Sequence, residues 1–151
     1  MKAGPELNYL KVRLLPGLYF VSTPIGSARD ITLRALDVLA SADLIAAEDT
    51  RSLRRLMEIH GIPLEGRRLV AYHDHSGERV QERLLAAVAE GQAVAYASEA
   101  GTPLIADPGF ELGRAATEAG HLVTAAPGVS AMVTALTLAG LPTDAAFFGG
   151  F

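Results

Sequence analysis

The stretch Ala93-Val94-Ala95-Tyr96-Ala97-Ser98-Glu99-Ala100-Gly101-Thr102-Pro103-Leu104-Ile105-Ala106-Asp107-Pro108-Gly109 joins a short apolar run to a loop rich in glycine and proline. The run 93–97 does not alternate between apolar and polar residues, which is typical of a strand covered on both faces. In the loop, Gly101 permits backbone conformations that other residues avoid, while Pro103 and Pro108 fix their own φ. The sequence therefore predicts a buried strand that ends in a stiff loop of small side chains.

A loop of this kind has two interpretations. It can be a plain connector between a strand and a helix, because glycine and proline often only punctuate structure. It can also be a pocket wall, since the ligands of open α/β sheets bind outside the carboxyl ends of the strands. The loop is long for a strand-to-helix connection, which favours the pocket.

Apolar segments like 93–97 recur along the chain, and each is followed by a helical pattern. We expect strands at 18–22, 43–47, 69–72, 93–97 and 122–125. Asp30 and Ser76 lie near two expected helix starts, and Gly91 and Gly120 lie at two expected helix ends. This alternation predicts an α/β fold in which helices cover both faces of a parallel sheet, an αβα sandwich.

The composition narrows the class of protein. The 151 residues carry a formal net charge of −4 and no cysteine, which excludes disulfides and thiolate metal sites and fits a reducing cytoplasm. No apolar run approaches the roughly 20 residues of a membrane span, so we expect no membrane partner. The net charge argues against a broad basic face for nucleic acid and leaves local clusters such as Arg51, Arg54 and Arg55.

Both ends of the chain differ from the region between them. We expect residues 1–16 to form a loose leader and residues 17–126 to form the α/β domain. From Pro127 the pattern changes, because residues 131–139 form a helix that is apolar on nearly every side. Residues 145–151 resemble the opening of another strand, so 127–151 is interpreted as an interdomain helix and the truncated start of a second domain.

The connections after the strands hold the candidate binding residues. Neither Gly-x-x-x-x-Gly-Lys nor Gly-x-Gly-x-x-Gly follows the first strand, which disfavours ATP and ordinary dinucleotides as ligands. Instead, Thr23-Pro24 after the first strand matches Thr102-Pro103 after the fourth, and we expect both pairs to line one crevice. Ile25 follows as an exposed apolar side chain, which suits an adenosyl or thioether ligand better than a triphosphate.

Two further motifs carry charged or titratable groups. Glu48-Asp49-Thr50-Arg51 follows the second strand, where Asp49 or Thr50 can simply cap a helix, or Asp49 and Arg51 can face a substrate. His73-Asp74-His75 follows the third strand. A metal site needs further ligands, so we expect no metal and interpret His73 or His75 as hydrogen-bonding a substrate.

These motifs together resemble the bacterial small-subunit rRNA methyltransferase I family of the tetrapyrrole-methylase superfamily. The resemblance spans residues 18–151 and rests on Thr23-Pro24-Ile25-Gly26, Ala47-Glu48-Asp49-Thr50-Arg51, His73-Asp74-His75, Ala100-Gly101-Thr102-Pro103-Leu104-Ile105 with Asp107-Pro108-Gly109, and Pro127-Gly128 with Ser130-Ala131. The chain departs from the family pattern mildly, with Ser27 in place of asparagine, Glu99 in place of aspartate, Ala106 in place of a small polar residue and Val129 in place of proline.

The resemblance implies a homodimeric enzyme that uses S-adenosylmethionine to methylate the ribose 2′-hydroxyl of a cytidine in small-subunit rRNA. It also implies two α/β domains with the cofactor between them, so we expect the chain alone to be inactive. The implied cofactor-binding residues are Ile25, Ala100, Gly101, Thr102, Ile105, Ser130 and Ala131, and the implied substrate-binding residues are Asp49, Arg51, His73 and His75. The proton acceptor stays open among Asp49, Glu48 and His73.

Two alternatives are kept beside this hypothesis. One is a methyltransferase that acts on tetrapyrroles, of porphyrin or corrin type, within the same superfamily. The other is a noncatalytic domain that binds partners through the apolar helix around Met132.

Overall fold

The computed structural model describes residues 7–105 and 109–150, in which strands and helices alternate along the chain. The strands are β1 (Gly17–Val21), β2 (Leu44–Ala47), β3 (Leu69–Ala71), β4 (Ala93–Ala97) and β5 (Val123–Ala126). The helices are α1 (Leu33–Ser41), α2 (Thr50–Ile59), α3 (Glu78–Ala89), α4 (Gly109–Glu118) and α5 (Ala131–Leu138). The strands predicted from the apolar runs are therefore confirmed, with only small shifts at their ends.

The strands form one parallel sheet in the order β3-β2-β4-β1-β5. Strands β4 and β1 are neighbours, with Gly17 in register with Ala93 and Val21 in register with Ala97. Every residue of both strands is buried, because helices cover both faces of the sheet. This strand order brings the loops after β1 and β4 together at the carboxyl edge of the sheet.

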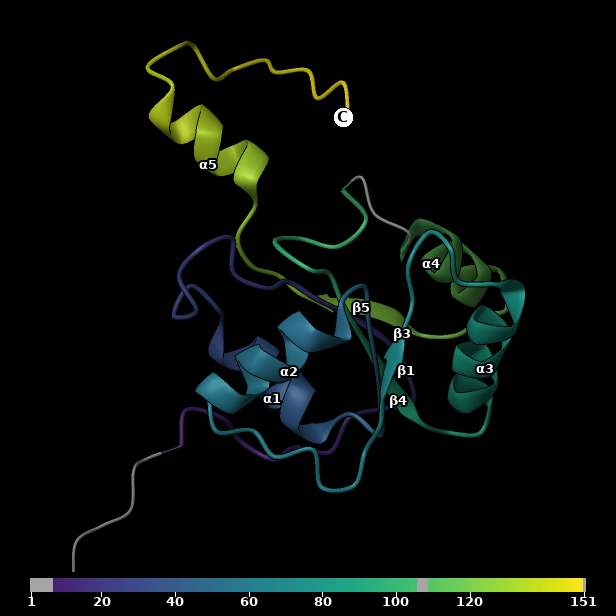
Figure 1. The fold of residues 1–151 in the computed structure, drawn as a ribbon. Helices are drawn as coiled ribbons and strands as arrows, with labels where there is room; N and C mark the ends of the chain where they lie inside the picture. The colour runs from purple at the N-terminus through teal and green to yellow at the C-terminus, as the bar shows by residue number, and fades with distance from the viewer. Residues whose placement is uncertain (1–6, 106–108, 151) are drawn as a thin grey trace, which may run out of the picture.

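Helices α1 and α2 cover one face of the sheet, and α3 and α4 cover the other (Figure 1). Alternate side chains of β1 enter the two cores, Tyr19 on the α1 side and Phe20 on the α4 side. In the second core, Phe20 and Tyr72 meet the ring of Tyr96 edge to face, with centroid separations of 5.9 and 5.8 Å. The predicted αβα sandwich is confirmed.

Two helices begin differently from the sequence expectation. Helix α1 follows Thr32, whose hydroxyl caps the first turn, rather than Asp30. Helix α3 follows Gly77 without a side-chain cap. Ser76, the predicted cap of α3, instead accepts a hydrogen bond from the backbone N–H of His73 at 2.8 Å. Short polar side chains bond to several nearby backbone groups with similar energy, so spacing alone does not choose among them.

The predicted helix ends are confirmed. Gly91 follows α3 with φ of 91°, and Gly120 follows α4 with φ of 78°. Glycine adopts this left-handed conformation without the cost that a Cβ atom would add, and so ends both helices.

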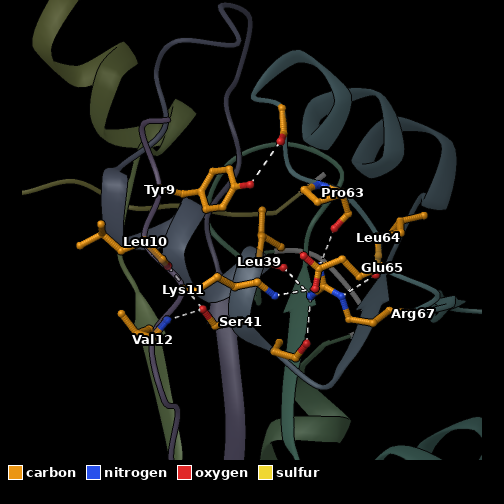
Figure 2. A network of polar contacts seen from close by, with 12 residues as sticks. Tyr9, Leu10, Lys11, Val12, Leu39, Ser41, Pro63, Leu64, Glu65 and Arg67 are labelled. Carbon is orange, nitrogen blue, oxygen red and sulfur yellow. Dashed lines mark hydrogen bonds and ion pairs between the residues drawn. The ribbon is translucent and has the colours of Figure 1, made fainter. Parts of the chain in front are cut away.

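The segment before β1 is not a loose leader over its described part. The backbone N–H of Leu10 donates to the carboxylate of Asp37 on α1 at 2.6 Å, and that of Val12 donates to an α1 hydroxyl at 2.9 Å. Lys11 forms an ion pair with Glu65 at 2.8 Å (Figure 2). The sequence prediction is wrong here because the segment's partners lie far along the chain, and its first six residues lie outside the described part.

Arg67 ties together the amino end of the sheet. One terminal nitrogen of its guanidinium donates to the carbonyls of Leu39 and Ala42 at the end of α1, at 2.7 and 2.9 Å. The remaining nitrogens donate to Leu64 at 2.8 Å and to Pro63 at 2.9 Å (Figure 2). Burial lowers the pKa of Arg67, yet a guanidinium stays protonated. Its charge complements the negative end of the helix dipole of α1.

Helix α5 projects away from the sandwich, and the residues after it run back over the carboxyl edge of the sheet (Figure 1). None of its residues is buried, so the predicted all-round apolar helix is present without a core around it. Residues 145–150 form no strand, contrary to expectation, because they pair with no neighbouring strand among the described residues. Phe151 lies outside the described residues. In the described ranges, no helix is long and apolar enough to cross a membrane.

Candidate functional site

The loops after β1 and β4 are joined by a short antiparallel bridge between Thr23 and Gly101. The N–H of Thr23 donates to the carbonyl of Gly101 at 3.0 Å, and the N–H of Gly101 donates back at 2.9 Å. The Thr23 hydroxyl donates to the carbonyl of Ser98 at 3.1 Å, while the Ser98 hydroxyl donates to that of Gly101 at 2.6 Å. These buried bonds fix the two loops as a single wall, which we call the bridged wall (23–26 and 98–102).

Gly101 is required at its place in the bridged wall for two reasons. Its φ is 80°, in the left-handed region that favours glycine. A Cβ atom there would also lie 3.3 Å from the Cγ2 atom of Ile25, which packs over this residue. The rigidity predicted for the loop after β4 therefore comes from its neighbour as well as from its own prolines.

The segment between β5 and α5 packs against the bridged wall. The Thr102 hydroxyl donates to the carbonyl of Val129 at 2.8 Å. A Cβ atom on Gly128 would lie 2.7 Å from the Cβ of Ser22, so only glycine permits this approach. The three connections after β1, β4 and β5 thus form one continuous surface.

A cavity of about 790 Å³ opens between the bridged wall and α5. Six of the seven predicted cofactor-binding residues line it: Ala100, Gly101, Thr102, Ile105, Ser130 and Ala131. The seventh, Ile25, is not among its lining residues and instead packs against Gly101. Met132 of α5 and Phe148 of the following segment complete the apolar lining. Residues 106–108, including the Ala106 departure, lie outside the described residues.

Among the described residues, the charged side chains that line this cavity are both acidic. They are Glu48, at the end of β2, and Glu99, in the bridged wall. The carboxylate of Glu48 accepts a hydrogen bond from the N–H of Glu99 at 3.0 Å, which joins the β2 connection to the wall. Glu48 is not among the binding residues predicted from the motifs, although it directly follows a buried strand. The cavity is therefore apolar with a negative wall, which suits a cation that carries an apolar body.

A second cleft, of about 420 Å³, lies on the other side of the bridged wall, against α2. Thr23, Pro24 and Glu99 line it from the wall, and Arg51 and Arg55 line it from the helix. The sequence expectation of one crevice is thus corrected, since Thr23-Pro24 faces the second cleft while Thr102 faces the first. Side chains on two strand loops can be neighbours and still face opposite ways.

Of the predicted substrate-binding residues, Asp49 serves as the N-cap of α2. One oxygen of its carboxylate accepts from the N–H groups of Arg51 and Ser52 at 2.9 and 3.0 Å. The capping interpretation is confirmed for Asp49, whereas Thr50 is the first helical residue. This cap leaves Arg51 free to lie along the second cleft.

His73 and His75 lie apart from both cavities. They follow β3, the edge strand next to β2, and neither lines the cavity or the second cleft. The rings are 6.0 Å apart, and the N–H of His75 donates to the Nδ1 atom of His73 at 3.2 Å. Among residues 7–105 and 109–150, no group of three histidine or carboxylate side chains could hold a metal ion.

Comparison with known proteins places this geometry in a family. Residues 17–148 match the model of the tetrapyrrole (corrin/porphyrin) methylases. A Mesorhizobium japonicum protein named ribosomal RNA small subunit methyltransferase I is 51% identical over 138 residues, covering 91% of this chain and 46% of its own length. The protein of the same name from Escherichia coli is 52% identical over 134 residues, covering 89% of this chain and 46% of its own. The chain spans about half the length of these curated relatives.

Solved structures agree with the fold. The uroporphyrin-III-C-methyltransferase of Thermus thermophilus is 29% identical with a TM-score of 0.61, over 84% of this chain and 54% of that one. A diphthine synthase superposes with a TM-score of 0.64 at 22% identity, over 83% of this chain and 49% of its own, and supports the fold alone.

Proposed function

The chain belongs to the family of tetrapyrrole (corrin/porphyrin) methylases, and on that premise we propose that it binds S-adenosylmethionine for methyl transfer to small-subunit ribosomal RNA. The observation that carries the proposal is the cavity beside the bridged wall, where small residues and two carboxylates meet. The names of the curated relatives support an rRNA acceptor. The finer proposal is that the acceptor is the ribose 2′-hydroxyl of a cytidine.

The residues present fit this cofactor. The volume of about 790 Å³ lies in the range of small-molecule sites. Apolar lining by Ile105 and Met132 suits an adenine ring, and the carboxylates of Glu48 and Glu99 favour a cationic ligand over an anionic one. We assign cofactor contacts to Ala100, Gly101, Thr102, Ile105, Ser130 and Ala131, with Ile25 supporting them. When bound, S-adenosylmethionine supplies a methyl group already activated by a positively charged sulfur.

The chain itself would align the two reactants and accept the proton of the hydroxyl group. A wall fixed by paired backbone hydrogen bonds holds its ligands in a set orientation, and such alignment contributes about 7–11 kcal/mol in favourable cases. In transfer to a hydroxyl, the oxygen–methyl bond forms, the sulfur–methyl bond breaks, and the hydroxyl proton passes to a base. Of the three candidate bases, Glu48 lines the cavity, Asp49 caps α2, and His73 lies after the edge strand. The structure thus favours Glu48 as the acceptor of that proton.

We further propose that residues 127–151 form the junction to a second domain that completes the cofactor site. The exposed apolar side chains of α5 and of the following segment support this, as does the greater length of the curated relatives. Calorimetry should detect weak binding of S-adenosylmethionine by this chain and tight binding by a version extended to the length of those relatives. Equal affinity of the two proteins would contradict an interdomain site.

Methyl transfer is tested with the extended version, radiolabelled S-adenosylmethionine and small-subunit particles. After alkaline hydrolysis, we expect label in an alkali-resistant dinucleotide, because a methylated 2′-oxygen cannot attack the neighbouring phosphate. Label in mononucleotides would instead indicate base methylation. Transfer to a porphyrinogen but not to rRNA would favour a tetrapyrrole methyltransferase, and no transfer to either would favour a noncatalytic domain.

A further inference from the structure

We propose that the second cleft, between α2 and the bridged wall, binds the ribose–phosphate backbone of the RNA strand that carries the acceptor hydroxyl, through Arg51 and Arg55. The inference rests on the proposed function and adds to it a site, in which Arg51 and Arg55 of the local basic cluster act and Arg54 does not.

The two cavities on either side of the bridged wall have opposite charge. In the part of the chain that the structure describes, the charged residues of the first are Glu48 and Glu99. In the second, Arg51 and Arg55 outweigh Glu99, which gives a positive lining. A cationic cofactor and a polyanionic acceptor are therefore each matched to one side of the wall. In a chain with a net charge of −4, a positive cleft at this edge is a local exception to the overall balance.

The two arginines are spaced to act together. Four residues apart on one helix, they present their side chains on the same face, with Cβ atoms about 5–6 Å apart. Each guanidinium offers a planar fork of donors that matches phosphate oxygens. Arg55 has a contact at 3.7 Å with Glu58, but both side chains are largely exposed, so this ion pair is weak and readily exchanged for a phosphate.

The lining of the second cleft also includes apolar side chains, which a phosphate group alone would not use. Pro24 lies on one side, and Leu53, Leu56 and Ile59 of α2 supply apolar surface on the other. Ile59 is 51% exposed, which leaves an apolar surface open beside the guanidinium groups. A nucleotide combines a phosphate with a flat base whose faces are apolar, and so uses both parts of this lining.

The second cleft lies next to the first cavity, in which we propose that the methyl donor binds. Glu99 lines both cavities, so a strand bound in the second cleft passes the edge of the first. The N–H groups of Arg51 and Ser52 are occupied by the Asp49 cap, so the positive charge offered to a backbone phosphate comes from the guanidinium groups. The acceptor hydroxyl is thereby brought to the shared edge of the wall.

The experiment is fluorescence anisotropy of a labelled single-stranded RNA, titrated with the chain at several salt concentrations. The test variant is Arg51→Ala/Arg55→Ala. The matched control is Arg54→Ala/Arg83→Ala, which removes the same charge from α2 and α3 outside both cavities. Circular dichroism and thermal unfolding verify that both variants fold.

We expect the test variant to lose several-fold in affinity and to lower the salt slope by about 1.4, because each phosphate contact to a single strand contributes about 0.7. The control should bind nearly as the parent chain does. Equal losses in both variants would overturn the cleft and leave the proposed methyl transfer standing, since that is measured separately. Absence of RNA binding by the parent chain would also overturn it. Methyl transfer that fails on rRNA while the cleft binds RNA would overturn only the proposed function.

Discussion

The two ends of the sheet use arginine in opposite ways. At the amino end, Arg67 gives its donors to four backbone carbonyls of its own chain. At the carboxyl end, Arg51 and Arg55 lie exposed along a cleft. The first arrangement satisfies the end of α1 and the loop between α2 and β3, whereas the second leaves donors for a ligand. Internal satisfaction of polar groups, more than residue type, therefore distinguishes the amino end of this sheet from the end that carries the two cavities.

The largest expected effect on stability comes from removing the Arg67 hydrogen bonds at the amino end of the sheet. Arg67→Ala leaves carbonyls at the end of α1 without their charged donor, and we expect a loss of about 2–3 kcal/mol in the free energy of unfolding. Urea denaturation measures it. The neighbouring exposed Arg68→Ala is the matched control and should change stability by less than about 0.5 kcal/mol. A similar loss in both variants would show that charge, rather than the carbonyl network, stabilises this end.

The next effect lies in the bridged wall. Gly101→Ala forces a side chain into the left-handed region at φ of 80° and against Ile25, which costs about 1–2 kcal/mol. Unlike Arg67→Ala, it should also weaken binding of S-adenosylmethionine, measured by calorimetry. As a control, Gly61→Ala places the same change at a left-handed glycine with open space around it. If both variants lose affinity for S-adenosylmethionine, backbone strain at a left-handed glycine would explain the loss, and the location of Gly101 in the bridged wall would not.

A smaller effect separates charge from shape in the first cavity. Glu48→Gln keeps an acceptor for the N–H of Glu99 but removes one negative charge. We expect affinity for S-adenosylmethionine to fall roughly five-fold, equivalent to about 1 kcal/mol, and that for neutral-sulfur S-adenosylhomocysteine to change less. Glu82→Gln on α3 is the control for net charge. Equal losses for the two ligands would contradict charge recognition at the sulfur.

The smallest effect concerns the ion pair of Lys11 with Glu65. The hydrogen bond from the Lys11 ammonium, together with its charge, holds the pKa of Glu65 below its usual value. The carboxylate therefore adds stability above the pKa of the unfolded chain, and this contribution is lost as pH falls through the lower, folded value. Lys11→Met should lower stability slightly at neutral pH and not at all in strong acid. A difference from the parent chain that persists in acid would mean that Lys11 acts through packing.

The features that depend on short-range interactions could be predicted from the sequence. The unbroken apolar run 93–97 is buried on both faces, and Gly91 and Gly120 end helices through their own backbone freedom. The small residues of the loop after β4 were also predicted to form a pocket wall, and they line the first cavity. These features depend on neighbours in the chain, which a single sequence contains.

The remaining features depend on strand order, which local patterns do not determine. His73 and His75 read as equivalent to the other motifs after strands, but β3 is an edge strand and holds them away from both cavities. Arg67 and Arg68 are adjacent arginines, yet Arg67 donates to carbonyls at the end of α1, and its sequence neighbour is exposed. The partners of such side chains lie tens of residues away, so a pattern of residue types cannot identify them.

The bridge between Thr23 and Gly101 has a consequence for the order of events during folding. Its supporting bond from Thr23 to Ser98 spans 75 residues of chain, so it forms only after β1 has docked beside β4. Contacts of such long sequence separation are slow to form. A refolding chain therefore completes the bridged wall only after its central strands have paired.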